Sequence, residues 1–358
     1  MEYIKIKDIL EFKKKSKIKA SEGLKRGKYN FYTSSKEQNK FLDYYEYSNE
    51  SIIIGTGGNA NIHHSYGKFS VSTDCFVLEN KAKEYFLLEY IYRYLLKNIH
   101  ILENGFRGAG LKHISKEYLE NIEVPIISLE KQKKLIKILE NIDIFIGKNK
   151  QIKTELKFLN KSLFTRMFGD IKTNDKNWEI KKLKELVEIK SYRINENLDS
   201  IWLLNLEDIE PNTGKLIRKR EISFENIPNS TISFNEDYIL YSKLRPYLNK
   251  VFLPDEKGVG TSELVPLLPK KIINKIFLVE YLRNDKVVDF LSQKVSGAKM
   301  PRIIMKEFQD LNLIVPSIEL QNKFAERVEK IEKLSFEIEK SIKEAENLYN
   351  SLMNKYFD

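Results

Sequence analysis

The sequence predicts an α/β protein of the mixed α+β kind, with two domains separated by an antiparallel pair of long coiled-coil helices. Three observations lead to this fold class. The chain has 358 residues, enough for two domains of roughly 150 residues each. One segment is repeated, and each copy carries apolar residues at helical spacing. The blocks between the copies mix strand-like and helix-like patterns.

The repeat has a shift of 189 residues, which lays residues 110–169 over residues 299–358 without a gap. Twelve of the sixty aligned positions are identical, a weak signal in a chain rich in Lys, Glu and Ile. The hydrophobic register is stronger evidence, because apolar residues recur at spacings of three and four in both copies and form one stripe along a helix. The stripe consists of Leu135, Leu139, Ile142, Ile146, Ile152, Leu156, Leu159, Leu163 and Met167 in the first copy, and of Phe324, Val328, Ile331, Ala345, Leu348, Leu352 and Tyr356 in the second.

Each copy is predicted to form one helix of about 40 residues, roughly 60 Å long at about 1.5 Å per residue. Ser128 and Ser317 stand where an N-cap residue belongs, and Pro125 and Pro316 end the strands before them. A single stripe on so long a helix needs a partner, and the nearest candidate is the other copy. The linker after the first helix reaches at most about 30 Å, so we expect the second helix to run back along the first.

The chain is therefore divided into a first variable block, residues 1–127, a first long helix, 128–168, a linker, 169–177, a second variable block, 178–316, and a second long helix, 317–358. In the first block, the pattern predicts a strand into a glycine turn over 51–58, a half-buried strand over 68–78 and a helix over 85–99. In the second block, it predicts strands near 201–206, 238–241, 250–253 and 264–268, and a helix over about 272–291.

Charge and cysteine content narrow the class of protein. The chain has 61 Lys and Arg against 51 Asp and Glu, a net charge of +10 that suits a polyanionic partner without requiring one. The single cysteine, Cys75, allows no disulfide within the chain and no cysteine-based zinc site, so a reducing cytoplasm is expected. We find neither an apolar signal core nor an apolar run near the roughly 20 residues that span a bilayer.

Two glycine-rich loops invite cofactor interpretations. Residues 106–110 spell F-x-G-x-G, a pattern that methyltransferases use for S-adenosylmethionine, but no hydrophobic strand leads into it and the chain has no Pro-Pro pair. We expect this loop to bring Arg107, Lys112 and His113 to a surface. Residues 55–61 lack the Lys-Ser/Thr of a nucleotide-binding loop. They are either an ordinary turn or a loop whose Asn and Gly residues approach the edges of DNA bases.

Two further segments carry polar and basic groups. His63 and His64 are adjacent on a predicted strand and so point to opposite faces, which disfavours a shared metal and favours surface or DNA-facing roles. Residues 242–250 combine Lys, Arg, Tyr and Asn, which suit contacts to phosphates and guanine more than a solvated turn. Lys299 and Arg302 correspond through the repeat to the region of Lys112.

The predicted DNA-binding set, with no catalytic and no metal-binding residue, is Thr56, Gly57, Asn59, Asn61, His63, Lys68, Arg107, Lys112, His113, Ser242, Lys243, Arg245, Tyr247, Asn249, Lys250, Lys299 and Arg302.

The order of variable block, helix, variable block and helix resembles the specificity subunits of type I restriction–modification systems over the whole chain. In that family a glycine-containing loop leads through hydrophobic residues and a proline into a Glu-x-Gln helix start, and residues 110–132 and 297–321 are similar to it. Residues 53–59 with 70–74 resemble one recognition-domain subtype, and residues 238–247 resemble another. Ile127 stands where the family often has a second proline.

The resemblance implies a non-catalytic subunit whose two target-recognition domains each read half of a bipartite site in double-stranded DNA. It implies two modification (methyltransferase) subunits on the helices, restriction subunits beyond them, and a spacer length set by the helices. S-adenosylmethionine would then be bound by the modification subunit and ATP with Mg by the restriction subunit, and no cofactor by this chain. The alternative is a coiled-coil scaffold that assembles proteins without reading DNA sequence.

Overall fold

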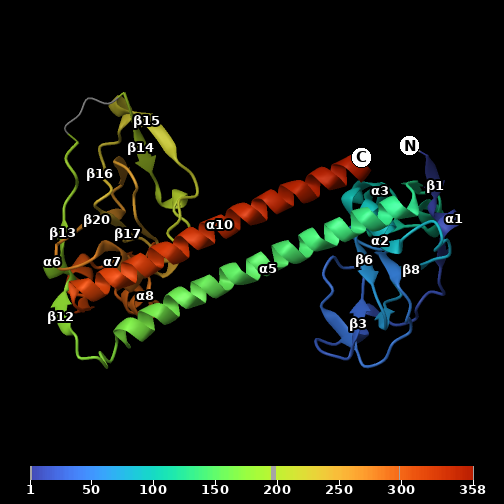
Figure 1. Ribbon diagram of the computed structural model, residues 1–358, viewed down its shortest axis with the longest axis horizontal. Helices are drawn as coiled ribbons and strands as arrows, with labels where there is room; N and C mark the ends of the chain where they lie inside the picture. The colour runs from blue at the N-terminus through green and yellow to red at the C-terminus, as the bar shows by residue number, and fades with distance from the viewer. Residues whose placement is uncertain (1, 195–198, 298, 358) are drawn as a thin grey trace. The chain divides into compact units, whose positions relative to one another are not determined.

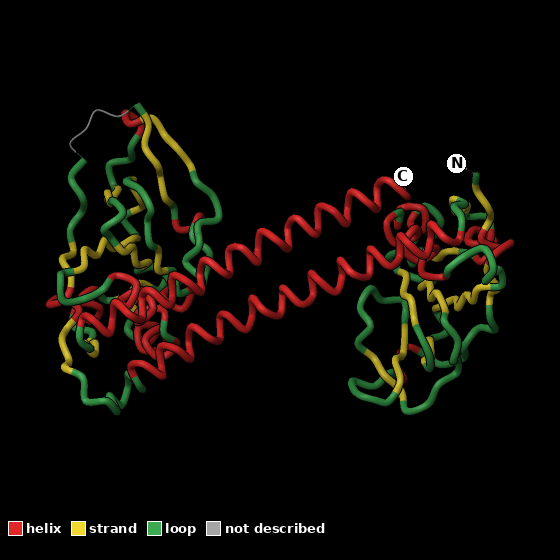
Figure 2. The backbone as a smooth tube through the Cα atoms, in the orientation of Figure 1, coloured by secondary structure: helices red, strands yellow, loops and turns green. Residues whose placement is uncertain are grey.

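The computed structural model describes residues 2–194, 199–297 and 299–357. It divides into two compact units, Met1–Lys150 with Lys340–Asp358, and Gln151–Glu339. Each unit holds one mixed α/β domain together with part of each of two long helices, α5 (Leu129–Phe168) and α10 (Ile318–Phe357) (Figure 1). Both helices are unbroken over 40 residues, as the sequence predicts (Figure 2).

The domain of the first unit is built on two sheets. Its central sheet has the strand order β2-β8-β5-β6, with every pair antiparallel, and its second sheet has the order β4-β3-β7, with β3 and β7 parallel. The strands are β1 (Tyr3–Lys5), β2 (Leu10–Phe12), β3 (Tyr29–Tyr32), β4 (Lys40–Leu42), β5 (Ser51–Gly55), β6 (Ile62–Ser65), β7 (Phe69–Val71), β8 (Cys75–Asn80), β9 (Phe106–Arg107), β10 (His113–Ile114) and β11 (Glu123–Pro125). The short helices are α1 (Ile6–Ile9), η1 (Ala20–Glu22), α2 (Leu88–Lys97), α3 (Ile99–Glu103) and α4 (Lys116–Glu120).

The domain of the second unit repeats this plan. Its central sheet has the order β13-β20-β17-β18, and its second sheet has the order β15-β14-β19-β16, with β14 and β19 parallel. The strands are β12 (Glu179–Lys182), β13 (Val187–Ile189), β14 (Ser200–Leu204), β15 (Arg220–Ser223), β16 (Thr231–Phe234), β17 (Ile239–Ser242), β18 (Val251–Phe252), β19 (Gly258–Thr261), β20 (Leu264–Pro269), β21 (Val295–Ser296), β22 (Arg302–Ile303) and β23 (Asn312–Val315). The helices are α6 (Leu183–Leu186), η2 (Leu206–Asp208), η3 (Phe224–Asn226), η4 (Pro246–Leu248), α7 (Lys275–Arg283), α8 (Asp285–Gln293) and α9 (Met305–Gln309).

The two domains therefore share a topology that their sequences do not reveal. In each, an opening strand pairs with the strand before the long helix, β1 with β11 and β12 with β23. In each, a central strand, β5 or β17, lies next to β8 or β20 and is followed later by a two-stranded hairpin, β9–β10 or β21–β22. The hairpins coincide under the 189-residue shift, so the structural repeat begins earlier than residue 110.

Within each unit the two long helices run antiparallel, as expected from the sequence. In the first unit Lys150 of α5 pairs with Glu346 of α10 at 3.2 Å, while Leu135 near the start of α5 shares a core with Met353 near the end of α10. In the second unit Lys153 pairs with Glu339, and Phe168 lies edge-on to Phe324 with ring centroids 5.1 Å apart. In each unit, residues early in α5 therefore lie beside residues late in α10, or late residues of α5 beside early residues of α10, as in an antiparallel pair.

Two predicted elements were wrong in detail. The alternating segment 68–78 is not one strand, because a turn separates β7 from β8 and the two strands belong to different sheets. Ser72 makes this turn, since its carbonyl accepts from Cys75 N at 3.2 Å and its hydroxyl from Asp74 N at 3.4 Å. The predicted helix over 272–291 is two helices, because the Asn284 side chain accepts from Lys286 N at 3.0 Å and starts α8.

The predicted apolar stripes were only partly right. Leu135, Leu139, Ile142 and Leu156 are buried, but Ile152 and Leu159 are 40% and 50% exposed. On α10, Leu348 is 51% exposed, and it is the repeat equivalent of Leu159. The helices therefore carry apolar side chains that neither their partner helix nor their domain covers.

Candidate nucleic-acid interface

In the first domain, the structure brings together two loops that the sequence analysis singled out separately. The loop after β5 lies between the turn after β7 and the hairpin β9–β10. Thr56 N donates to Asp74 O at 2.8 Å, Ile114 N donates to Thr56 O at 3.1 Å, and Gly58 N donates to Lys112 O at 3.2 Å. These three hydrogen bonds, with an isolated bridge between Gly57 and His113, fix the loop against the hairpin.

The second domain contains the same three hydrogen bonds. Lys243 N donates to Glu263 O at 3.0 Å, Ile303 N donates to Lys243 O at 2.9 Å, and Arg245 N donates to Pro301 O at 2.7 Å. An isolated bridge joins Leu244 to Arg302, as one joins Gly57 to His113 in the first domain. Thr56 thus corresponds to Lys243, and Gly58 corresponds to Arg245. We call this loop and hairpin of each domain the presenting loops.

The exposed side chains of the presenting loops are polar and basic. In the first domain Asn59, Arg107, Lys112 and His113 are exposed, and Gly57 is half-buried. In the second domain Arg245, Tyr247, Lys299 and Arg302 are exposed, and Lys243 is half-buried. These groups can donate hydrogen bonds to phosphates or to base edges.

Arg302 differs from the other exposed cations because a carboxylate holds it. Its Nε and Nη2 donate to Glu263 at 2.9–3.2 Å, and the hydrogen bond and charge of Glu263 raise the pKa of the guanidinium. This fork-to-carboxylate geometry occupies the donors that a phosphate or guanine would use. Arg302 is therefore placed to stiffen the hairpin beside Arg245 rather than to contact a ligand freely.

Five of the predicted residues point into their own domain. Thr56, Asn61, Ser242 and Asn249 are buried, and Lys250 is half-buried. Asn61 Nδ2 donates to Asn59 O at 2.9 Å, Ser242 Oγ donates to Leu244 O at 2.9 Å, and Lys250 Nζ donates to Leu206 O at 2.6 Å. Burial lowers the pKa of Lys250. These side chains shape the presenting loops from behind, a role that sequence patterns do not distinguish from DNA contact.

Two predicted DNA-binding residues of the first domain, Lys68 and His63, contact other parts of the domain instead of the presenting loops. Lys68 comes just before β7, at the end of that strand opposite to Asp74, and its ammonium lies 4.6 Å from the ring centre of Tyr45. His63 is half-buried, and its Nε2 lies 2.7 Å from Ser35 O. No sequence pattern marked the loop that holds Ser35. Ser34 Oγ accepts from Gly57 N at 3.1 Å, so this loop supports the presenting loop directly.

No sequence pattern marked the exposed apolar residues near the turns of the two hairpins either. Leu111 is 81% exposed, and its repeat equivalent Met300 is 45% exposed. Gly108 and Gly297, also equivalent, have φ angles of 138° and 90°, and a Cβ at either would meet the carbonyl oxygen of Leu111 or Met300. Gly108 and Gly297 therefore have the same left-handed backbone at equivalent positions, which only comparison of the two hairpins could have shown.

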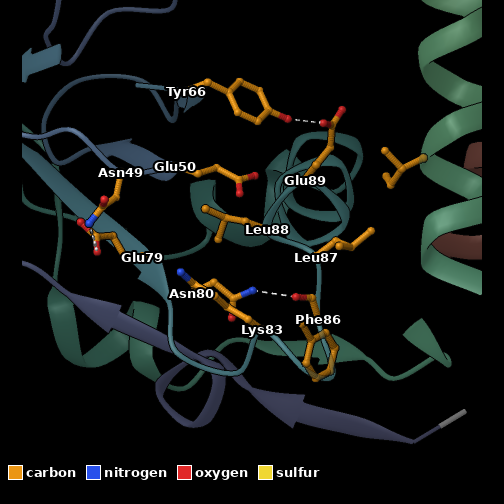
Figure 3. A pocket seen from close by; sticks show the side chains of 11 residues that line it. Asn49, Glu50, Tyr66, Glu79, Asn80, Lys83, Phe86, Leu87, Leu88 and Glu89 are labelled. Atoms are coloured by element: carbon orange, nitrogen blue, oxygen red, sulfur yellow. Dashed lines mark hydrogen bonds between the residues drawn. The ribbon is translucent and has the colours of Figure 1, made fainter. Parts of the chain in front are cut away.

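The cavity of about 440 Å³ in the first unit lies apart from the presenting loops (Figure 3). Its carboxylates are engaged: Glu50 with His64 at 2.9 Å, Glu79 with Asn49 at 3.1 Å, and Glu89 with Tyr66 at 2.5 Å. Figure 3 shows the Tyr66 hydroxyl directed at Glu89 across the cavity. Burial raises the pKa of Glu89, but hydrogen bonds from Tyr66 and Arg93 outweigh it, so the net shift is downward. A carboxyl in this state is a poor general acid.

Metal and thiol chemistry have little support in the part of the chain that the structure describes. No group of three or more His, Cys, Asp or Glu residues there is arranged to hold a metal ion. Cys75 is buried, and burial raises the pKa of its thiol to about 11, which makes it a packing residue rather than a nucleophile. Among the described helices, none combines the length and apolarity needed to cross a membrane.

Two topologically matched domains, each presenting a loop of different sequence on the same backbone hydrogen bonds, define a two-domain recognition protein. The sequence profile of the family described as "Type I restriction modification DNA specificity domain" matches residues 1–157 and 175–346. The chain belongs to this family, as its sequence pattern suggested.

Individual relatives agree with the family. The chain is similar to the type I restriction enzyme MjaVIII specificity subunit of Methanocaldococcus jannaschii, with 28% identity over 86% of this chain and 77% of the relative. It is similar to the type I restriction enzyme EcoDI specificity subunit of Escherichia coli, with 24% identity over 95% and 84%. Its fold is similar to the crystal structure of a type I restriction-modification S subunit from M. genitalium, with a TM-score of 0.68, 16% identity, and 100% and 96% coverage.

Proposed function

We propose that this chain is the DNA-reading, non-catalytic subunit of a cytoplasmic type I restriction–modification complex, and that each domain reads one half of a bipartite target in double-stranded DNA. The observation that carries the proposal is the pair of presenting loops. Three equivalent hydrogen bonds hold unlike side chains in the two domains, at 2.8–3.2 Å in the first and 2.7–3.0 Å in the second. A rigid scaffold with interchangeable surface groups is what reading of two different half-sites requires.

The helices supply the proposed docking surface for two modification subunits, with restriction subunits beyond them. Phe145 and its repeat equivalent Leu334 are 46% and 49% exposed, and Leu159 and Leu348 are 50% and 51% exposed. Large exposed apolar groups at matching positions suit two copies of one partner. S-adenosylmethionine would then be bound by the modification subunits, and ATP with Mg by the restriction subunits.

The scaffold alternative uses only these helices. It gives no reason for the exposed basic and amide groups on the presenting loops, or for their different identities in the two domains. The DNA-reading function and the scaffold function can be distinguished by DNA binding of the chain in complex with its methyltransferase subunits. Footprinting should show two protected patches separated by an unprotected spacer, whereas a scaffold would protect neither.

Exchanging the first domain is expected to change one half of the target only. Replacement of residues 1–125 with the corresponding block of another specificity subunit should alter the first half of the methylated motif, because each domain has its own core and its own presenting loops. Sequencing of methylated adenines in a host expressing the chimaera and its methyltransferase subunit measures this. Exchange of residues 178–316 is the reciprocal control. A simultaneous change in both halves would contradict independent reading.

Shortening both helices is expected to shorten the spacer. Residues 146–152 and 335–341 are equivalent under the repeat shift, and removing seven residues from each helix takes out two turns, so the apolar register survives. The helices lose about 10 Å at about 1.5 Å per residue, which corresponds to roughly three base pairs at about 3.4 Å each. Methylation mapping should report a spacer shorter by that amount.

The control for this experiment is deletion from one helix only, which should disrupt the antiparallel packing and reduce the yield of folded protein. A folded double-deletion variant that methylates the original spacing would contradict the proposed dependence on helix length.

A further inference from the structure

One backbone position is equivalent in the two presenting loops yet carries the smallest residue in one and the longest cationic residue in the other. Gly58 and Arg245 each donate their backbone N–H to the residue just before the second strand of the hairpin, Lys112 O at 3.2 Å and Pro301 O at 2.7 Å. Both have left-handed backbones, with φ angles of 80° and 51°. We call this position the vertex of the loop.

The left-handed conformation is natural for Gly58 and costly for Arg245. A Cβ in this region approaches the following carbonyl oxygen, at a cost of order 1–2 kcal/mol for residues other than Gly, Asn or Asp. Arg245 is not one of these residues, so its left-handed conformation at the vertex carries this cost. The backbone does not require an arginine, so the reason for it must lie in the side chain.

The side chain of Arg245 is free to act on a ligand. It is exposed, and among the described residues its guanidinium makes no hydrogen bond or ion pair. Its backbone is held on both sides, by Pro301 through its own N–H and by Glu263 and Ile303 through Lys243. Arg302 next to it is bound by Glu263. Arg245 thus carries an exposed guanidinium on an anchored backbone, beside a guanidinium already paired with Glu263.

We propose that Arg245 is a specificity-determining residue of the second domain and reads a guanine of the second half-site. The proposal rests on the function proposed above. The planar fork of an arginine matches the O6 and N7 acceptors of guanine in the major groove, and fixed attachment turns this match into discrimination. By the same geometry the vertex of the first domain, Gly58, contributes no base-reading side chain to the first half-site.

The test compares Arg245→Gly and Arg245→Ala in the complex with the methyltransferase subunits. Both variants should lose discrimination at one G·C pair of the second half-site by roughly 5- to 150-fold, the equivalent of about 1–3 kcal/mol. Methylation mapping and binding to duplexes carrying 7-deazaguanine, which lacks the N7 acceptor, measure this. Arg245→Gly should also denature at a higher temperature than Arg245→Ala, because only glycine relieves the left-handed strain.

Lys271→Ala is the matched control. Lys271 is an exposed cation two residues after the end of β20. The presenting loop lies at the other end of this strand, where Leu264 pairs with Ser242. It should leave the discrimination of both half-sites unchanged. Unchanged discrimination in both Arg245 variants overturns the inference. So does equal weakening on every sequence with a shallower salt dependence, which would mark a phosphate contact. If the parent complex itself protects no half-site, the proposed function fails, and the two failures are distinguishable.

The reciprocal variant is Gly58→Arg in the first domain. No atom lies within 4 Å of the position of a Cβ at Gly58, so a side chain has room there. The variant should gain a sequence preference at one base pair of the first half-site and leave the second half-site unchanged. A folded Gly58→Arg complex with an unchanged methylated motif would contradict the equivalence of the two vertices.

Discussion

Replacing Arg93 with alanine is expected to destabilise the first unit by about 3 kcal/mol, near the lower end for breaking a buried ion pair. Arg93 is 8% exposed and joins the domain to both long helices. It donates to Glu89 of α2 at 2.8 Å, to Asp143 of α5 at 2.9 Å and to the Tyr349 hydroxyl of α10 at 3.0 Å. Without it, Glu89 stays largely buried and loses the guanidinium that contacts it directly, keeping the hydrogen bond from Tyr66 and, at 4.0 Å, the His64 ring.

The effect should depend on pH in a defined direction. Although burial raises the pKa of Glu89, hydrogen bonds from Tyr66 and Arg93 bring it below its ordinary value in the folded protein. A lowered folded pKa contributes stability above the unfolded pKa of about 4.3, and this contribution is lost as pH falls through the folded pKa. The difference between the parent and Arg93→Ala should therefore be largest at neutral pH and shrink in acid.

Chemical denaturation at several pH values, with hydrogen exchange of the α2 amides as a local readout, measures this. Lys116→Ala is the matched control, because it removes an exposed pair with Glu120 at 3.4 Å that should contribute less than about 1 kcal/mol. A deficit for Arg93→Ala that is as small as that of the control, or that grows as pH falls, would contradict a stabilising role for this ion pair.

In the second unit, different residues join the domain to the long helices. The backbone N–H groups of Leu87 and Asn274 donate to the equivalent residues Gln132 and Gln321, and counting six residues on from each makes Glu280 the equivalent of Arg93. Glu280 accepts from Asn160 Nδ2 at 2.8 Å and from Arg283 at 3.2 Å. Glu332, the repeat equivalent of Asp143, has a pKa raised by burial. The contact between domain and helices is thus polar in both units, but its charges are not conserved by the repeat. A polar contact whose charged residues differ between the two units cannot be predicted from hydrophobic periodicity.

The repeat, the two long helices and their reversal could be predicted because they depend on regular spacing. The stripe through Leu135 and Leu139 has the period of a helix, and its recurrence needs no knowledge of contacts. The equivalence of Gly58 and Arg245 could not be predicted. Their separation is 187 residues instead of 189, since the two loops are followed by segments of different length, and the match depends on backbone hydrogen bonds.

Side-chain direction was the main limit on predicting the candidate site. Asn61 and Asn59 are two residues apart in one loop, yet Asn61 is buried and Asn59 is exposed. The same holds for Tyr247 and Asn249. An irregular loop has no regular side-chain period that shows which residues face the core and which face solvent. Residue type alone therefore predicted the same DNA-binding role for both residues of each pair. The functional proposal therefore depends on the exposed members.

Replacing Gln321 with leucine is expected to destabilise the second unit by about 3–5 kcal/mol, more than any loop substitution considered above. Gln321 has no exposed surface and lies in the first turns of α10. Its Oε1 accepts from Asn274 N at 2.8 Å, and its Nε2 donates to Pro316 O at 2.8 Å and to Ile272 O at 3.2 Å. Leucine of similar size would leave three backbone groups without partners, one buried and two partly buried, at about 1–3 kcal/mol for each buried group before relaxation.

Gln132 makes the same set of contacts in the first unit, accepting from Leu87 N at 2.8 Å and donating to Tyr85 O and Ile127 O at 2.8 and 2.9 Å. Gln132→Leu should therefore destabilise the first unit by a similar amount and leave the second unit unaffected. Two-step chemical denaturation, with hydrogen exchange to assign each step to a unit, measures both variants. This explains the Glu-x-Gln helix start in mechanical terms: the glutamine attaches each domain to the helix that follows it.

Two further variants separate hydrogen bonding from general disruption of the helix start. Gln321→Glu keeps the shape and the acceptor but loses both donors and buries a charge, so it should be at least as destabilising as leucine at neutral pH and less so in acid, where the carboxyl is neutral and can donate once. Lys323→Ala changes an exposed residue two positions later and should shift the unfolding free energy by less than about 0.5 kcal/mol. Equal stability of Gln321→Leu and Lys323→Ala would show that the glutamine does not hold the second domain on its helix.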